Sequence, residues 1–435
     1  MGRIYYQFID VTDYGPFITK LILGLPAPVS AAALKAAGKP AELFNVHVRV
    51  LDKKGDVVQM PKSFLERDVL WPSEGYRIVK DAYPSTRTGE TLEESEYLTL
   101  ELVYGPIYKC TSAIASDPKN INGHGSYTVH DYTVTQLVPI ETPEGTALNG
   151  LVFDRCAGVF NPKESRFKQG AAKNGMRYGY YVPSLKGSES GRHPLIIFLH
   201  GAGEGGFDTA VPYTGNKVTC FTEPDTQALF GGAFVLAPQC ETMWLDDGSH
   251  QYGSSGKSMY VKDLKECIDE FIADYADAID TDRILLGGDS NGGFMTMRML
   301  MDYPDFFAAA FPICEAMLDE RISEEDIAHL KEIPIWFTHA KNDPVVVPDK
   351  YVVPTYKRLI AAGAKNCHFT FWDKIVDIHA GWDTPDGKPF EYFGHFAWIP
   401  MFNNDCKVDF DGSPVMTDGK AVSIFEWLSG ASRKH

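Results

Sequence analysis

The sequence has no excess of positive charge. Its 435 residues include 41 lysines and arginines against 58 aspartates and glutamates, which gives a formal net charge of −17 at pH 7. A nucleic-acid-binding surface needs clustered basic residues, so we expect no nucleic-acid partner. The chain also lacks any apolar run of the roughly 18 residues that a membrane-spanning helix requires. We therefore expect no membrane span.

Paired cysteines and a leader segment are missing as well. The eight cysteines are scattered and form no C-x-x-C pair, so a zinc site has little support and no disulfide pairing can be deduced. Residues 1–5 show no charged segment followed by an apolar one. Such a start fits either a cytoplasmic protein or a secreted one whose signal has been removed, so the sequence leaves the compartment open.

Residues 1–140 predict an all-β domain. Apolar and polar residues alternate in several segments, as expected for strands with one buried face. Clusters of Gly, Pro and Asn separate these segments, a pattern typical of an immunoglobulin-like sandwich. Residues 141–150 are expected to form a linker. We expect strands at 17–23, 44–50, 97–104 and 127–134, and a short helix at 30–37.

Residues 151–435 predict a second domain of the α/β class. Strand-like runs alternate here with helical ones, which indicates a mostly parallel sheet flanked by helices. Unbroken apolar runs at 194–199 and 233–237 predict buried strands. Apolar residues spaced by three and four over 260–275 predict an amphipathic helix. Further strands are expected at 284–286, 308–313, 333–337 and 369–372, and further helices at 295–301, 352–362 and 421–428.

A G-x-S-x-G pattern, Gly288 to Gly292, lies between a predicted strand and a predicted helix. This pattern is typical of a sharp turn that exposes a serine hydroxyl at the top of a sheet. Such a turn strains its middle residue, so its neighbours must be small. The start of the following helix favours negative charge beside the hydroxyl. Ser290 is therefore the candidate nucleophile, with a purely structural glycine-rich turn as the alternative.

A serine needs a base that takes its proton and a third group that orients the base. Asp343 follows the predicted strand at 333–337 and is the candidate acid, although an Asp-Pro pair also forms turns. His379 and His395 are the candidate bases, and their local sequences do not decide between them. The order Ser, Asp, His is that of α/β-hydrolases. His339 is too close to Asp343 to be the base and is expected to have a structural or supporting role.

A glycine-rich loop, residues 200–206, follows the predicted strand at 194–199. A loop in this position can supply backbone N–H groups to an oxyanion. We assign the N–H groups of Ala202 and Asn291 as the oxyanion donors, with that of Gly201 as an alternative, and we expect His200 to be structural.

Two further patterns suggest ligands and are rejected. The loop at 200–206 also spells G-x-G-x-x-G, but a dinucleotide site requires a helix to start at its glycines, and residues 207–215 form a poor helix. The acidic segment at 405–412 lacks the spacing and the terminal glutamate of an EF-hand loop. We therefore expect no metal and no cofactor.

These segments together resemble bacterial serine esterases of the α/β-hydrolase fold that carry an N-terminal immunoglobulin-like domain. Their relatives are the polyhydroxybutyrate depolymerase-like and prolyl-oligopeptidase-like hydrolases. The segment at 395–398 is similar to the family's His-x-x-Trp, which carries the catalytic histidine, so the resemblance favours His395 over His379. The chain departs from the family's pattern in two places. Residues 403–420 look like an insertion, and Glu315 stands where glycines are expected. The other matching stretches are 13–16, 194–206, 234–239 and 288–293.

The resemblance implies a serine carboxylesterase that works through an acyl-enzyme and acts on feruloyl, acetyl or other short to medium acyl esters. The candidate pocket residues are Trp244, Glu315 and Trp398. For Trp244, which follows the predicted strand at 233–237, a place at the end of the core is an equal alternative. The expected partner is a small ester or an ester-decorated polysaccharide, and the edge strands of the first domain suggest a homo-oligomer. The alternatives are a serine peptidase of the prolyl-oligopeptidase type and a non-catalytic protein that binds glycans or another partner.

Overall fold

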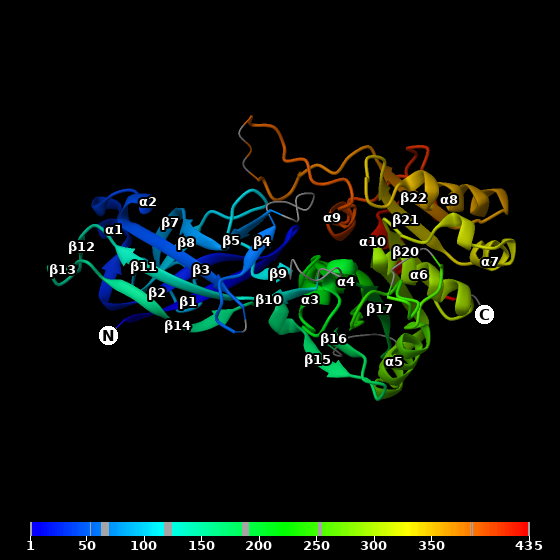
Figure 1. The fold of residues 1–435 in the computed structure, drawn as a ribbon, viewed down its shortest axis with the longest axis horizontal. Coiled ribbons are helices and arrows are strands. Elements are labelled where there is room, and N and C mark those ends of the chain that lie inside the picture. Colours follow the sequence, from blue (N-terminus) through cyan, green and yellow to red (C-terminus); the bar gives the residue numbers. More distant parts are fainter. Residues whose placement is uncertain are drawn as a thin grey trace. The chain divides into compact units, whose positions relative to one another are not determined.

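The computed structural model describes residues 2–52, 54–61, 69–116, 124–184, 191–250, 255–382, 384 and 386–433. The chain divides into two compact units (Figure 1). The first consists of Met1–Ile121 and Ser126–Ser165, and the second of Asn122–Gly125 and Arg166–His435. Each unit is described by itself below.

The first unit is built on an eight-stranded sheet in the order β6-β3-β11-β14-β1-β2-β8-β7. Only β1 and β14 pair in parallel; the other neighbours are antiparallel. Val48 of β3 and Leu100 of β8 lie far apart in this order but belong to one apolar core, so the sheet folds around that core as a sandwich does. The predicted all-β domain is confirmed. The strands are β1 (Arg3–Thr12), β2 (Gly15–Ser30), β3 (Phe44–Leu51), β6 (Glu74–Arg77), β7 (Val79–Ser85), β8 (Glu94–Leu102), β11 (Val129–Gln136) and β14 (Val152–Phe160).

Short elements complete the first unit. The predicted helix is α1 (Ala31–Ala37), and the side chain of Ser30 caps it by accepting a hydrogen bond from Ala33 N. A one-turn helix, α2 (Pro40–Leu43), follows it. Three two-stranded sheets are formed by β4 (Gln59–Pro61) with β5 (Leu70–Pro72), β9 (Ile114–Ser116) with β10 (Gly125–Tyr127), and β12 (Ile140–Glu141) with β13 (Ala147–Leu148).

The boundary between the two units lies further along the chain than the linker expected from the sequence. The expected linker at 141–150 contains the β12–β13 hairpin, and β14 then enters the sheet between β1 and β11. The ladder hydrogen bonds of β14 hold residues 152–160 in the first unit. The division therefore falls after Ser165 and not at residue 150.

The second unit contains the predicted, mostly parallel sheet, in the order β15-β16-β18-β17-β19-β20-β21-β22. β15 and β16 are antiparallel to their neighbours, and the strands from β18 to β22 run in parallel. The strands are β15 (Lys168–Ala171), β16 (Arg177–Tyr181), β17 (His193–Leu199), β18 (Phe234–Gln239), β19 (Ile279–Asp289), β20 (Ala309–Ile313), β21 (Ile335–Ala340) and β22 (Cys367–Trp372).

Helices connect the parallel strands. α5 buries one apolar stripe against the sheet, with Leu264, Cys267, Ile268 and Phe271 at helical spacing. The helices are α3 (Val211–Thr214), α4 (Pro224–Phe230), α5 (Val261–Asp274), α6 (Asn291–Asp302), α7 (Glu324–Leu330), α8 (Val352–Ala361), α9 (Trp398–Phe402) and α10 (Ile424–Ser429). Single 3₁₀ turns lie at Glu164–Arg166, Ala202–Glu204, Val218–Thr222, Asp319–Arg321 and Pro348–Lys350, and a small hairpin joins β23 (Met416–Thr417) to β24 (Lys420–Ala421).

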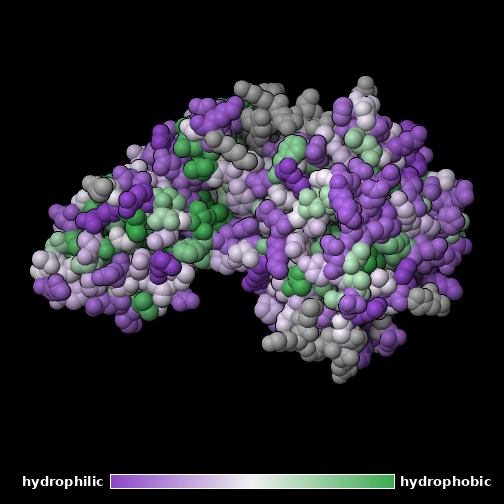
Figure 2. All heavy atoms as spheres, turned by 90° about the horizontal axis from the view of Figure 1, so that it is seen from below, coloured by the Kyte–Doolittle hydropathy of each residue, from purple (hydrophilic) through white to green (hydrophobic). Residues whose placement is uncertain are grey.

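Figure 2 shows mainly polar and charged residues over the second unit on the face it presents. None of the described helices is both long and apolar enough to cross a bilayer. All eight cysteines are free thiols.

Candidate active site

Ser290 lies between the end of β19 and the start of α6. Its backbone angles, φ 53° and ψ −113°, are strained for a residue with a side chain. The backbone N–H of Ser290 donates to Ile313 O of β20 at 2.9 Å, which ties the turn to the neighbouring strand. The half-buried side chain thus stands at the carboxyl end of a central strand, where catalytic groups of α/β folds gather.

The glycines around Ser290 are required by close backbone packing. A Cβ atom at Gly292 would lie 1.8 Å from Leu199 O, and one at Gly288 would lie 2.6 Å from the same atom. Real Cβ atoms essentially never approach that closely. The first turn of α6 therefore lies directly against the end of β17, and only glycine allows this contact.

His395 contacts both other candidate residues. Its Nε2 lies 2.9 Å from Ser290 Oγ, and its Nδ1 lies 2.7 Å from Asp343 Oδ2. His395 as a whole residue is 6% exposed and stands in the loop between β22 and α9. The Trp398 ring meets it edge-on, with 5.8 Å between centroids and 85° between planes. These contacts fix the orientation of the imidazole.

Asp343 lies in the loop after β21 and is held from several sides. Its Oδ1 accepts hydrogen bonds from Val345 N at 2.8 Å and Val346 N at 3.1 Å. Its Oδ2 also accepts a hydrogen bond from His339 Nε2 at 3.0 Å. Burial alone would raise the pKa of Asp343, but the hydrogen bonds and charges of His339 and His395 outweigh burial and hold this pKa well below its usual range. The carboxylate is therefore ionised at neutral pH.

The other histidines considered from the sequence lie elsewhere. His379 Nε2 pairs with Asp405 Oδ2 at 2.8 Å, on an exposed part of the chain. His339 is fully buried behind Asp343 and also contacts Val346 O at 2.9 Å. The structure thus brings His395 to Ser290, gives His379 a different carboxylate, and places His339 where it supports Asp343.

Ala202 begins the 3₁₀ turn after β17, and Asn291 begins α6. The first N–H groups of a helix have no acceptor within it, so both can serve an oxyanion. The N–H of Gly201, the alternative donor, instead donates to Glu204 Oε2 at 2.8 Å. The side-chain Oδ1 of Asn291 accepts a hydrogen bond from Leu245 N at 3.0 Å, which fixes the start of α6.

His200 connects the glycine-rich loop to the end of β18. Its Nδ1 lies 2.7 Å from Gly201 O, and its Nε2 accepts a hydrogen bond from Cys240 N at 3.2 Å. Burial lowers the pKa of His200 to about 4, so the ring is neutral at neutral pH, with the proton on Nδ1. The imidazole therefore holds the loop in place.

Two buried carboxyl groups behind the turn were not found from the sequence. Asn216 Nδ2 donates to Glu204 Oε2 at 3.2 Å and to Asp289 Oδ2 at 3.0 Å, so one amide bridges them. Burial raises the pKa of Asp289 to about 7. Burial and the charge of Asp289 raise the pKa of Glu204 well above its usual range. Both residues belong to recognised glycine motifs, but nothing in either motif indicates that they meet.

The three candidate pocket residues are all largely buried. Trp244 has no exposed surface and packs against His200 at 5.0 Å between ring centroids, so it is a core residue and not a pocket wall. Glu315 also has no exposed surface; its Oε2 accepts a hydrogen bond from Met317 N at 2.7 Å, and burial raises its pKa to about 8. Trp398, 8% exposed, is the one that contacts His395.

One group of side chains within the described ranges has the spacing of a metal site. The ligand atoms of Cys314, Asp343 and His395 lie within 4.8 Å of one another. Asp343, however, already forms a hydrogen bond with His395 Nδ1, and His395 Nε2 contacts Ser290 Oγ. A metal ion there would take the imidazole nitrogen that Asp343 orients, so we assign no metal to this group.

Comparisons with known proteins identify the family of each of the two domains. Residues 5–149 match the model of the esterase Ig-like N-terminal domain, and residues 183–375 match that of the phospholipase/carboxylesterase family. The solved structure of a thermostable esterase aligns over 99% of both chains with a TM-score of 0.71 and 24% identity, which shows a shared fold. No curated protein matches the chain.

Two further solved structures are more distant. A ferulic acid esterase and an S-formylglutathione hydrolase from Agrobacterium tumefaciens each align with 48% of this chain, and with 89% and 86% of their own. Their identities are 15% and 14%, and their TM-scores, 0.38 and 0.35, are too low to support an argument.

The family models confirm the resemblance drawn from the sequence and both predicted folds. The chain carries an esterase Ig-like domain followed by a phospholipase/carboxylesterase domain of the α/β-hydrolase fold, and it is an ester hydrolase.

Proposed function

We propose that this protein is a serine carboxylesterase in which Ser290, His395 and Asp343 form the catalytic triad. The observation that carries the proposal is the continuous chain of contacts from Ser290 Oγ to His395 Nε2 (2.9 Å) and from His395 Nδ1 to Asp343 Oδ2 (2.7 Å). These separations are within the range expected for a nucleophile, its base and the group that orients the base.

The reaction follows from this arrangement. Ser290 Oγ bonds to the ester carbonyl carbon while His395 Nε2 accepts the hydroxyl proton. Asp343 holds the Nδ1–H tautomer and stabilises the imidazolium that forms. The N–H groups of Ala202 and Asn291 donate to the developing oxyanion. His395 then protonates the leaving alcohol, and a water molecule, deprotonated by the same nitrogen, hydrolyses the acyl-enzyme and restores Ser290.

The proposed substrates are short to medium acyl esters, including feruloyl and acetyl esters on small molecules or polysaccharides. Aromatic side chains close to His395 support this choice of substrates. Half-buried Phe393 and Phe396 stand beside His395, with 5.7 Å between their ring centroids, and Phe396 packs on Trp398 at 4.6 Å. Apolar rings next to the reacting base favour an apolar acyl group. Parallel assays of p-nitrophenyl acetate, butyrate and octanoate, methyl ferulate and a proline anilide measure this preference and test the peptidase alternative.

The triad is tested by covalent labelling. A fluorophosphonate reacts with an activated serine, and mass spectrometry locates the adduct. We expect labelling at Ser290 that is lost in His395→Ala and retained in His379→Ala, a matched histidine variant. Adduct formation at another serine, or equal loss in both histidine variants, contradicts the assignment. In a folded wild-type sample, absence of any adduct would refute the assignment of Ser290 as an activated nucleophile.

A homo-oligomer formed through the first unit is also proposed. The strands β6 and β7 are the edges of the eight-stranded sheet, and unpaired edges can add a strand from another copy. Light scattering on the purified chain measures the mass directly, and a monomer at micromolar concentration would contradict the proposal.

A further inference from the structure

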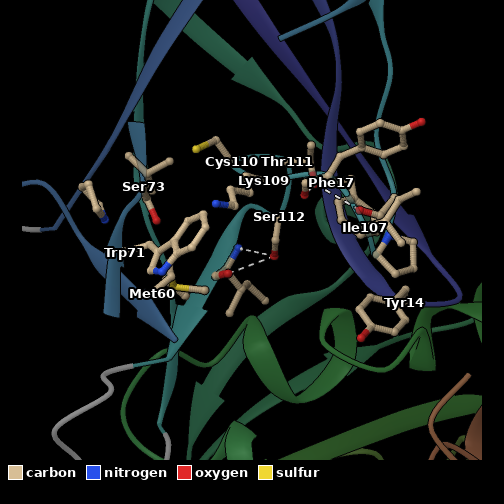
Figure 3. Close-up of a pocket in the computed structure, with 17 residues that line it drawn as sticks. Tyr14, Phe17, Met60, Trp71, Ser73, Ile107, Lys109, Cys110, Thr111 and Ser112 are labelled. Carbon is tan, nitrogen blue, oxygen red and sulfur yellow. Dashed lines mark hydrogen bonds between the residues drawn. The ribbon is translucent and has the colours of Figure 1, made fainter. Parts of the chain in front are cut away.

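The first unit contains a cavity of about 420 Å³ (Figure 3). This volume is in the range of roughly 300–1,000 Å³ that small-molecule sites occupy. The cavity walls come from the β1–β2 turn, from strands β2 to β5 and β9, and from the segment 105–112 that follows β8. All of these belong to the first unit, whereas Ser290 belongs to the second.

The walls of the cavity are apolar and aromatic. Figure 3 shows Met60 and Trp71 on one side and Phe17, Ile107 and Tyr14 on the other. Trp71 is 43% exposed and Ile107 is 53% exposed, although both are large apolar side chains. The rings of Tyr14 and Phe17 are stacked, with 6.4 Å between centroids and 13° between planes. Two facing apolar walls of this kind suit a flat ring.

Lys109 gives the cavity a positive charge. Its Nζ lies over the Trp71 ring, 3.0 Å from the centroid, as in a cation–π contact. In the part of the chain that the structure describes, no carboxylate lies within ion-pair distance of Lys109. An ammonium group held by an aromatic face retains its N–H donors for an anion.

A second cation lies behind the cavity wall. Arg77 is 6% exposed, and its guanidinium donates to Cys110 O at 3.0 Å, Ile18 O at 2.9 Å, Val103 O at 3.2 Å and the Tyr132 hydroxyl at 2.7 Å. None of these acceptors is a carboxylate. The buried charge therefore adds to the positive potential of the cavity. The same bonds hold residues 103–110 against β2, so this wall is formed before any ligand binds.

We propose that this cavity binds a small aryl carboxylate, with the aromatic ring between Trp71 and Phe17 and the carboxylate on Lys109 Nζ. The apolar walls account for the ring, and Lys109, which has no carboxylate partner among the described residues, accounts for the anion. The proposal does not depend on the triad assignment.

Calorimetric titration of the full chain at low salt tests the proposal, with trans-cinnamate as the probe and trans-cinnamamide as its neutral analogue. We expect cinnamate to bind at least roughly tenfold more tightly than the amide, since a charged hydrogen bond is lost in the amide. Lys109→Gln should weaken cinnamate binding by a similar factor and leave amide binding unchanged. Trp71→Leu should weaken the binding of both compounds.

The control variant is Lys80→Gln, which removes an exposed lysine of β7 in the same unit and should bind cinnamate as the wild type does. Circular dichroism verifies that each variant is folded. Equal affinities for acid and amide, unchanged cinnamate binding in Lys109→Gln, or binding of xylohexaose in place of cinnamate would each overturn the proposal. Loss of fluorophosphonate labelling with cinnamate binding intact would affect only the triad assignment.

Discussion

Replacing Asp289 with asparagine should stabilise the protein at alkaline pH. Asp289 is 1% exposed, and its Oδ2 accepts a hydrogen bond from Asn216 Nδ2. An asparagine side chain has nearly the same shape, keeps an oxygen for this bond and carries no charge. The variant therefore removes the ionisation of the buried group with little change in packing.

The magnitude follows from the pKa of Asp289. Burial raises this pKa from 3.8 to about 7, and each pKa unit corresponds to about 1.4 kcal/mol. Because the pKa is raised in the folded state, the stability of the protonated form is fully present below pH 4 and is lost as the pH rises through 7. Above pH 8, wild type should therefore carry a penalty of up to about 4 kcal/mol that Asp289→Asn lacks.

The same ionisation should affect catalysis. Asp289 and Glu204 approach so closely that a Cβ atom at Gly201 would lie 2.7 Å from one carboxyl oxygen and 3.5 Å from the other. When both carboxyls are charged, their repulsion acts on the Ala202–Glu204 turn, which carries a proposed oxyanion donor. We expect the alkaline decline of kcat/KM to move to higher pH in Asp289→Asn.

The assay is urea unfolding at pH 5 and pH 8.5, followed by circular dichroism and by loss of esterase activity, so that the transition of the second unit is identified. Asp274→Asn, at an exposed position of α5, is the matched control and should show no pH-dependent gain. Equal destabilisation of Asp289→Asn at both pH values, or a wild type more stable than the variant at pH 8.5, would refute the reasoning.

Three further variants test other parts of the site. His339→Gln should raise the pKa of Asp343 by removing one of its hydrogen-bond donors, so the stability that ionised Asp343 contributes above roughly pH 4 should fall; urea unfolding measures this, and an equal loss of stability at pH 3 and pH 7 contradicts it. Gly292→Ala should prevent formation of the turn and yield insoluble or inactive protein, whereas Gly430→Ala, with its nearest atoms at 3.8 Å, should be tolerated; full activity in the first would be inconsistent with the close packing. Because burial raises the pKa of Glu315 from 4.5 to about 8, wild type loses stability as the pH rises from the unfolded pKa through the folded one. Glu315→Gln should therefore match wild type in stability at pH 4 and exceed it at pH 9.5; chemical unfolding measures both, and equal stabilities at pH 9.5 would count against a raised pKa of Glu315.

Hydrophobic periodicity made most of the fold predictable. The unbroken apolar run at 194–199 became β17, and the spacing of three and four over 260–275 became α5. The periodicity of apolar residues indicates which face of a helix or strand is buried, whichever element packs against that face. The same reasoning missed β14, because residues 152–160 pair with strands from the start of the chain and their burial pattern does not alternate cleanly.

The candidate site was predictable in part. Ser290 and the glycines around it follow from a local pattern, since the constraint on the turn is local. The choice between His379 and His395 did not follow from the residues themselves, and only the resemblance favoured His395. Trp244 was named as a candidate pocket residue and lies in the core. The sequence could not decide this, because a tryptophan that follows a strand is found equally well in a pocket wall or in the core.

The sequence by itself determined the two fold classes, the strand–turn–helix at Ser290 and the residue types available for catalysis, because these depend on near neighbours along the chain. The tertiary structure alone decided which side chains meet. It brought His395 to Ser290 across 105 residues, paired Glu204 with Asp289 across the ends of two strands, and left Lys109 on an aromatic ring without a carboxylate among the described residues. Such contacts depend on strand order and on the packing of distant segments, which a local pattern does not encode.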